Sequence, residues 1–99
     1  MRPGDLKLVL TCHGCPEQYD IYDVSLKGRG EYVGYIRYRW GYLALHPVTK
    51  GQVDWNIEVW NWSCNDGLSG ILPLEERDQI LNTCKEELSK WWNKRYCLE

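Results

Sequence analysis

Tyrosine and tryptophan occur seven and six times in this chain, with no phenylalanine, and most of them lie between Tyr32 and Trp62. There they alternate with charged residues at a spacing of two. Because successive side chains of a β-strand point to opposite faces, this spacing predicts a half-exposed antiparallel sheet. Tyr and Trp each join a large apolar body to a polar tip, which suits a surface that is wet in one state and covered in another. We therefore expect a sheet with more aromatic surface than one small core requires.

The alternation divides the chain into four to five short strands. Trp40-Gly41 predicts a tight turn, since glycine adopts a positive φ without steric cost. Pro47 is expected to end the strand before it. Of all the segments, 53–62 has the most regular alternation. The expected strands are 6–11, 18–24, 32–39, 42–46 and 53–62.

The spacing of apolar residues changes to three or four from Leu74 to Arg95, which predicts an α-helix. Its stripe should bury Leu81, Cys84 and Leu88 against the sheet. The fold class is therefore α+β: an antiparallel meander of four to five strands with one C-terminal helix packed across it. Residues 1–97 fit a single domain. Leu98-Glu99 has the form of a tag junction, and we leave it out of the functional argument.

The phase of the strands predicts a binding patch on one sheet face. In 32–39, one phase holds Tyr32, Ile36 and Tyr38, and the other holds Val33, Tyr35, Arg37 and Arg39. In 53–62, one phase holds Val53, Trp55, Ile57 and Val59, and the other ends in Trp60 and Trp62. If the apolar phases form the core, the remaining phases share the opposite face. The predicted patch is Tyr35, Arg37, Arg39, Trp60 and Trp62.

Arginine beside Trp and Tyr is typical of two kinds of surface. It marks the centres of protein interfaces, and it also stacks the bases of single-stranded nucleic acid. The net charge of −2 and the acidic residues expected nearby, Asp54 and Glu58, favour a protein partner or a second copy of the chain. No catalytic grouping or phosphate-binding loop is present in the sequence, so a non-enzymatic binding module ranks above an enzyme.

The segment Cys12-His13-Gly14-Cys15 allows three interpretations. Two thiolates at this spacing bind zinc in many small domains, and Cys64 would be the best third ligand. A thioredoxin-type dithiol needs a following helix, which residues 16–22 do not predict. The leading interpretation is a turn with two inert thiols and no cofactor. A zinc-stabilised module that binds nucleic acid is the alternative function.

The five cysteines and the start of the chain bear on location. No apolar run near the start is long enough for a signal peptide or a membrane helix, so we expect a cytoplasmic protein without membrane association and with reduced thiols.

The opening Leu10-Thr11-Cys12-His13-Gly14-Cys15-Pro16-Glu17-Gln18-Tyr19-Asp20, followed by Val33-Gly34-Tyr35-Ile36-Arg37 and the turn at Gly41, resembles small uncharacterised phage and prophage proteins with a Cys-x-Gly-Cys-Pro opening. The resemblance covers about the first half of the chain. It implies an accessory protein that acts by binding, and it transfers no activity or site residue.

Overall fold

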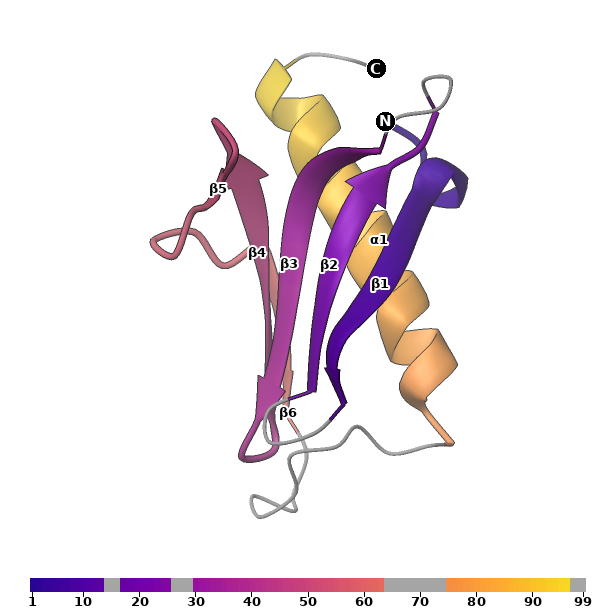
Figure 1. Ribbon diagram of the computed structural model, residues 1–99, viewed down its shortest axis with the longest axis vertical. Coiled ribbons are helices and arrows are strands. Elements are labelled where there is room, and N and C mark those ends of the chain that lie inside the picture. The colour runs from indigo at the N-terminus through magenta and orange to yellow at the C-terminus, as the bar shows by residue number, and fades with distance from the viewer. Residues whose placement is uncertain (14–16, 26–29, 64–74, 97–99) are drawn as a thin grey trace.

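The computed structural model describes residues 1–13, 17–25, 30–63 and 75–96. In this part of the chain, a six-stranded antiparallel sheet has one helix across one of its faces (Figure 1). The predicted α+β fold is confirmed. The elements are η1 (Pro3–Asp5), β1 (Leu6–His13), β2 (Glu17–Asp23), β3 (Glu31–Arg39), β4 (Tyr42–Thr49), β5 (Gln52–Val53), β6 (Trp60–Ser63) and α1 (Arg77–Tyr96).

The strands follow one another as a meander from β1 to β4, and both β5 and β6 then pair with β4. The predicted turn between β3 and β4 is confirmed, with φ of 55° at Trp40 and 74° at Gly41. Two positive φ values in a two-residue loop give the turn whose twist matches antiparallel strands. Lys50 and Gly51 repeat this geometry between β4 and β5, with φ of 54° and 78°.

The core lies between α1 and one face of the sheet. Ile21, Ile36 and Leu43 of the strands are fully buried there, and so are Cys84 and Leu88 of the helix. The predicted docking through Cys84 and Leu88 is confirmed. Leu81 is only partly buried, and Ile80, at 5% exposure, lies deeper. The helix therefore docks with a face rotated slightly from the stripe that the spacing predicted.

Gly34 of β3 lets the helix approach the sheet closely. A Cβ at this position would lie 2.6 Å from Leu88 Cδ2 and 3.2 Å from Ile21 Cδ1. Carbon atoms in contact normally stand about 3.5 to 4 Å apart. A side chain at this position would therefore force Leu88 to shift, whereas glycine fits the space between sheet and helix.

One predicted phase is wrong because β3 contains a β-bulge. Ile21 pairs with Gly34 but Tyr22 pairs with Tyr32, so Val33 is the extra residue. A bulge shifts the alternation by one residue. Val33 accordingly enters the core at 2% exposure, and Tyr32 lies on the opposite side, with its hydroxyl 2.9 Å from Asp20 Oδ1 and its ring 5.4 Å from that of Tyr22.

The predicted strand 53–62 is also wrong, since residues 54–59 leave the sheet. Val53 pairs with Val48 and Trp60 with Leu45, so these six residues stand opposite only His46 and Pro47. Pro47 does not end β4, as predicted, but lies within it. The Pro47 carbonyl accepts a hydrogen bond from the Asp54 N–H at 2.9 Å. Because the N–H and C=O of one strand residue point to the same side, the N–H that proline lacks would also have pointed toward the segment that contains Asp54. Because a proline cannot donate to a ladder, the neighbouring chain bulges out at this point.

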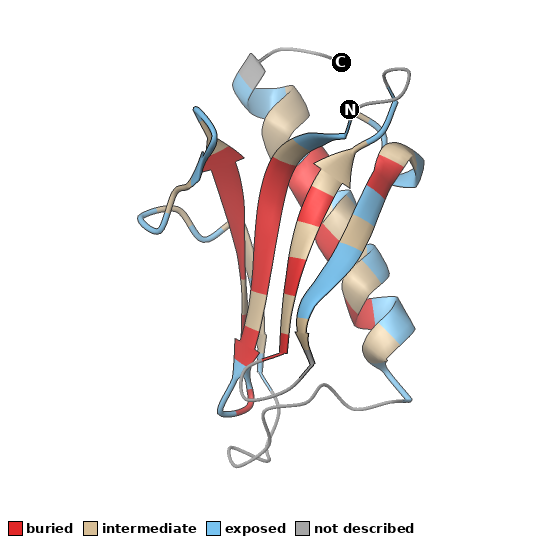
Figure 2. Ribbon diagram, viewed as in Figure 1, coloured by how far each residue is buried: buried red, intermediate tan, exposed pale blue. Residues whose placement is uncertain are grey.

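The other face of the sheet is not covered by a helix among the described residues, and Figure 1 views the sheet from this side, with α1 behind it. Buried positions nevertheless run along β3 and β4 in the same view, whereas the middle of β1, at the edge of the sheet, is exposed (Figure 2). No helix in the described ranges is long and apolar enough to cross a bilayer.

Candidate binding face of the sheet

Three residues of the predicted patch lie on the open face. Tyr35, Arg37 and Arg39 alternate along β3 and pair across the strands with His46, Ala44 and Tyr42 of β4. Cross-strand partners lie on the same face of a sheet. These six positions therefore form two adjoining columns on the side away from α1, and we call this surface the open face.

Trp60 and Trp62 do not belong to the open face, so this part of the prediction is wrong. They pair with Leu45 and Leu43, both fully buried under the helix, and they pack against the core. The Trp62 ring lies 6.2 Å from that of Tyr38. The alternation could not be counted from Val53 to Trp60, because it does not continue through the loop 54–59.

Trp55 takes their place on the open face. The sequence placed it in the core, but it is 58% exposed. Its ring makes edge contacts with Tyr35 and His46, at centroid distances of 5.4 and 5.2 Å. The loop is held by a contact of 2.8 Å between His46 Nδ1 and the Ile57 carbonyl and by the Asn56 N–H, which donates to Asp54 Oδ1 at 3.1 Å. These bonds hold the loop so that the exposed Trp55 ring lies against Tyr35 of β3 and His46 of β4.

Trp40 and Tyr42 supply exposed rings at the other end of the same columns, at 63% and 42% exposure. The Arg39 guanidinium carbon lies 5.6 Å from the centre of the Trp40 ring, within cation–π range. The Tyr42 hydroxyl donates a hydrogen bond to Glu58, and this bond raises the pKa of Tyr42. The tight turn thus places the backbone of Trp40 in the left-handed conformation, and the ring of Tyr42 follows two residues later at the start of β4.

Ala44 lies between these two ends and forms the floor of an open hollow of about 450 Å³. Arg37 and Arg39 line one flank, as their cross-strand register with β4 requires. Trp40 and Tyr42 stand at one end, and His46 and Trp55 at the other. The described lining contains two guanidinium groups, four rings and a methyl group, and no carboxylate and no larger aliphatic side chain.

The two arginines keep their charge available. Among the described residues, ion pairs join Arg77 to Glu17 and Lys90 to Glu87, and neither Arg37 nor Arg39 takes part in them. The acidic neighbours predicted for the arginines have other partners, because Glu58 accepts from Tyr42 and Asp54 from the loop backbone. The Arg37 Nε atom is shielded from solvent and has no hydrogen-bond partner within the described ranges. What suits the two arginines to an anionic group supplied from outside is that neither has a carboxylate partner in an ion pair among the described residues.

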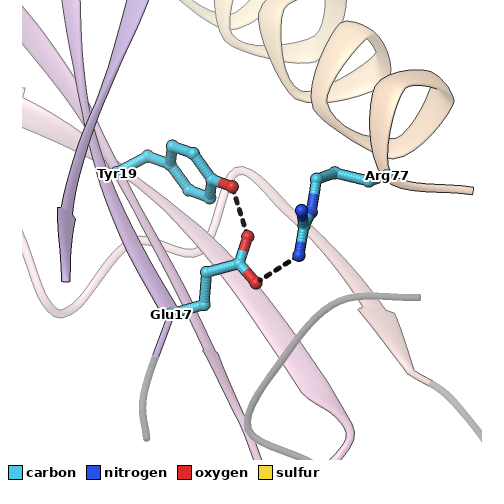
Figure 3. A network of polar contacts seen from close by, with 3 residues as sticks. All are labelled: Glu17, Tyr19 and Arg77. Carbon is cyan, nitrogen blue, oxygen red and sulfur yellow. Dashed lines mark hydrogen bonds and ion pairs between the residues drawn. The ribbon is translucent and has the colours of Figure 1, made fainter. Parts of the chain in front are cut away.

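A second polar cluster, which the sequence analysis did not predict, lies on the helix side of the sheet (Figure 3). Glu17, at 1% exposure, accepts a hydrogen bond from the Tyr19 hydroxyl and an ion-paired contact from Arg77 at 3.1 Å. Burial, followed by the bond to Glu17, raises the pKa of Tyr19. Glu17 lies on the same side of β2 as Tyr19 and Ile21, and Arg77 lies in the apolar stripe of the helix. Two opposite charges, each on a face expected to be buried, were the signal in the sequence that could have predicted this pair. The cluster joins the start of β2 to the start of α1, and we interpret it as structural.

The zinc prediction falls largely outside the described residues. Cys15 and Cys64 lie in the ranges that are not described, and Cys12 is half-buried in β1, opposite Gln18. Among the described residues, no group of three or more His, Cys, Asp or Glu side chains could hold a metal ion. Cys84 is fully buried in the core, and its burial raises the pKa of its thiol to about 12. The zinc site therefore stays a prediction.

Comparisons with protein-family models, with curated proteins and with solved structures found no match to this chain.

Proposed function

We propose that the protein is a small non-enzymatic binding module whose open face engages an anionic partner. One observation carries the proposal: the hollow over Ala44 is lined by two arginines and four rings, without a carboxylate among its described lining residues. Exposed Trp and Tyr beside Arg are the side chains that carry most binding energy at interfaces. The charge in the hollow calls for a partner that brings negative charge with it.

The sequence favoured a protein partner or a second copy. A second copy fits this face poorly, because a two-fold interface opposes the same patch on both subunits and would set arginines against arginines. An acidic protein surface satisfies the charge, and so does a nucleic acid. The cytoplasmic location and the resemblance to phage and prophage proteins stay predictions, and neither carries the proposal.

Two charge-matched variants test the proposal. Arg37→Gln/Arg39→Gln removes two positive charges from the open face, and Lys90→Gln/Lys94→Gln removes two from the exposed side of α1. Amide chemical shifts are followed while an Asp/Glu-rich peptide or a short oligothymidylate is added at low salt. We expect shifts along β3, β4 and the loop 54–59 with at least one probe. The open-face variant should lose them and the helix variant should keep them.

The proposal is overturned if neither probe shifts these amides, or if both variants respond alike. Light scattering over a range of protein concentrations adds a separate control. Self-association that depends on Arg37 and Arg39 would also contradict it, because it would show a second copy on this face.

The zinc-stabilised alternative is tested independently. Mass spectrometry under native conditions should find one zinc equivalent if Cys12 and Cys15 are ligands, and Cys12→Ser should then lower the melting temperature. A metal-free protein whose melting does not respond to a chelator would leave Cys12 as a structural thiol on β1.

A further inference from the structure

We propose that the hollow over Ala44 holds one base of a single-stranded nucleic acid while Arg37 and Arg39 hold the adjacent phosphates. This inference rests on the proposed function and names the partner that the open face takes. It draws on the shape of the hollow, the kind of side chain that lines it and the spacing of the arginines.

The shape follows from a gap in a row of rings. Ala44 lies two residues from Tyr42 and two from His46 along β4, and strand geometry places each about 7 Å away. The methyl group of Ala44 leaves the space between these rings open, and Trp40 and Trp55 extend the two ends outward. A flat group lying over Ala44 would meet an aromatic ring at either end.

The lining favours a base over a protein side chain. Protein interfaces usually bury an aliphatic or aromatic anchor in an apolar pocket. In this hollow the described lining has no Leu, Ile, Val or Met, and four aromatic rings line it instead. Stacking on such rings is tolerant of sequence, because every base has a π-face. An antiparallel sheet with exposed aromatics on the side away from its helix is also a known platform for stacking bases.

The arginines and amides supply the polar contacts. Arg37 and Arg39 project from the same face of β3, about 7 Å apart along the strand, and so can contact successive phosphates of an extended chain. Gln18 and Asn61 flank the Arg37–Ala44 pair in the same cross-strand row and can donate to or accept from the edge of a base. Glu58 opposes binding, but it lies outside the lining and is bonded to Tyr42.

The test separates base stacking from charge. The wild-type protein is titrated with oligothymidylate, with an abasic sugar–phosphate oligomer of the same length, with thymidine monophosphate and with the Asp/Glu-rich peptide. Tryptophan fluorescence reports binding. We expect oligothymidylate to bind about tenfold more tightly than the abasic oligomer, which corresponds to one stacked base. Thymidine monophosphate should bind more weakly than oligothymidylate, since it offers a single phosphate.

Two variants locate the base. Trp40→Asn removes a ring and places Asn-Gly in the turn, which is the preferred sequence for this geometry, so the fold should be retained. Ala44→Ile fills the floor without a change of charge. Each should lower affinity for oligothymidylate by about five- to tenfold and leave the abasic oligomer unaffected. The logarithm of the binding constant should fall with the logarithm of salt concentration with a slope of about −1.4 for two phosphates, and Arg37→Gln/Arg39→Gln should flatten it.

The outcomes distinguish this inference from the proposed function. Equal affinity for oligothymidylate and the abasic oligomer would overturn the base site, and so would unchanged affinity in both Trp40→Asn and Ala44→Ile. Tighter binding of the acidic peptide, lost in Arg37→Gln/Arg39→Gln, would overturn the nucleic acid and leave the open face as a protein-binding surface. Absence of binding to every probe would overturn both.

Discussion

Replacing Gly34 by alanine tests how closely the helix approaches the sheet. The added Cβ would lie 2.6 Å from Leu88 Cδ2, about 1 Å inside normal contact, and 3.2 Å from Ile21 Cδ1. Leu88 and Ile21 are both fully buried, so neither side chain can move without displacing its own neighbours. Overpacking of this kind costs about 1 to 3 kcal/mol. For a chain of this size each kcal/mol lowers the melting temperature by roughly 4 to 8 °C.

Urea denaturation, followed by tryptophan fluorescence, measures the effect. We expect a lower midpoint with an unchanged slope, which means lost stability without a change in the surface exposed on unfolding. Gly4→Ala is the control, since no atom lies within 4 Å of a Cβ at that position. The double variant Gly34→Ala/Leu88→Ala should be more stable than the sum of the two single effects predicts, because the second change removes the clashing methyl group. A Gly34→Ala protein as stable as the wild type would refute the close contact between β3 and α1.

Three further predictions concern the helix side of the sheet. Arg77→Met should destabilise the fold by about 3 kcal/mol, because it removes the arginine that is ion-paired with the buried carboxylate of Glu17, and Glu17→Gln/Arg77→Met should recover part of the loss in the same urea assay. Leu88→Ala should cost about 2 to 5 kcal/mol and Leu81→Ala clearly less, since only Leu88 is fully buried; equal melting temperatures would contradict this docking. The raised pKa of Tyr19 means that the folded state favours the protonated phenol, so its stabilising effect is complete below pH of about 10 and is lost as pH rises further. Tyr19→Phe should therefore lose less stability than the wild type between neutral and strongly alkaline pH, and parallel curves would show that Tyr19 does not contribute.

The local elements could be read from the sequence wherever the alternation is unbroken. The phase of Tyr35, Arg37 and Arg39 was correct, since β3 runs without interruption from Gly34 to Arg39. The turn at Trp40-Gly41 was correct because it depends on glycine chemistry rather than on tertiary contacts. Helix docking was right to within one residue, since a spacing of three or four leaves the direction of the stripe uncertain by a fraction of a turn.

The errors arose where a face was extrapolated across an interruption. Val33 reverses the alternation of β3 through a bulge beside Gly34, and a glycine inside a strand pattern was the available signal. Pro47 was the second signal. It led us to expect an end to its own strand, β4, rather than a break in the strand beside it. The ladder hydrogen bond that proline cannot make belongs equally to the neighbouring strand, and residues 54–59 bulge out as a result. A proline expected to lie inside a strand should therefore lower confidence in the alternation of the strand beside it.

The surplus of aromatic residues has two separate physical explanations in this fold. Trp60 and Trp62 lie on the helix side, where they pack against the core and add apolar area to it. Trp40 and Trp55 contribute little to that core, yet each is fixed in place, one by a tight turn and the other by a loop bonded to His46. Exposed tryptophan that is held rigidly loses little conformational entropy when a partner covers it. The fixed rings, together with the arginines between them, are why we assign binding to the hollow over Ala44 rather than to the aromatic residues as a whole.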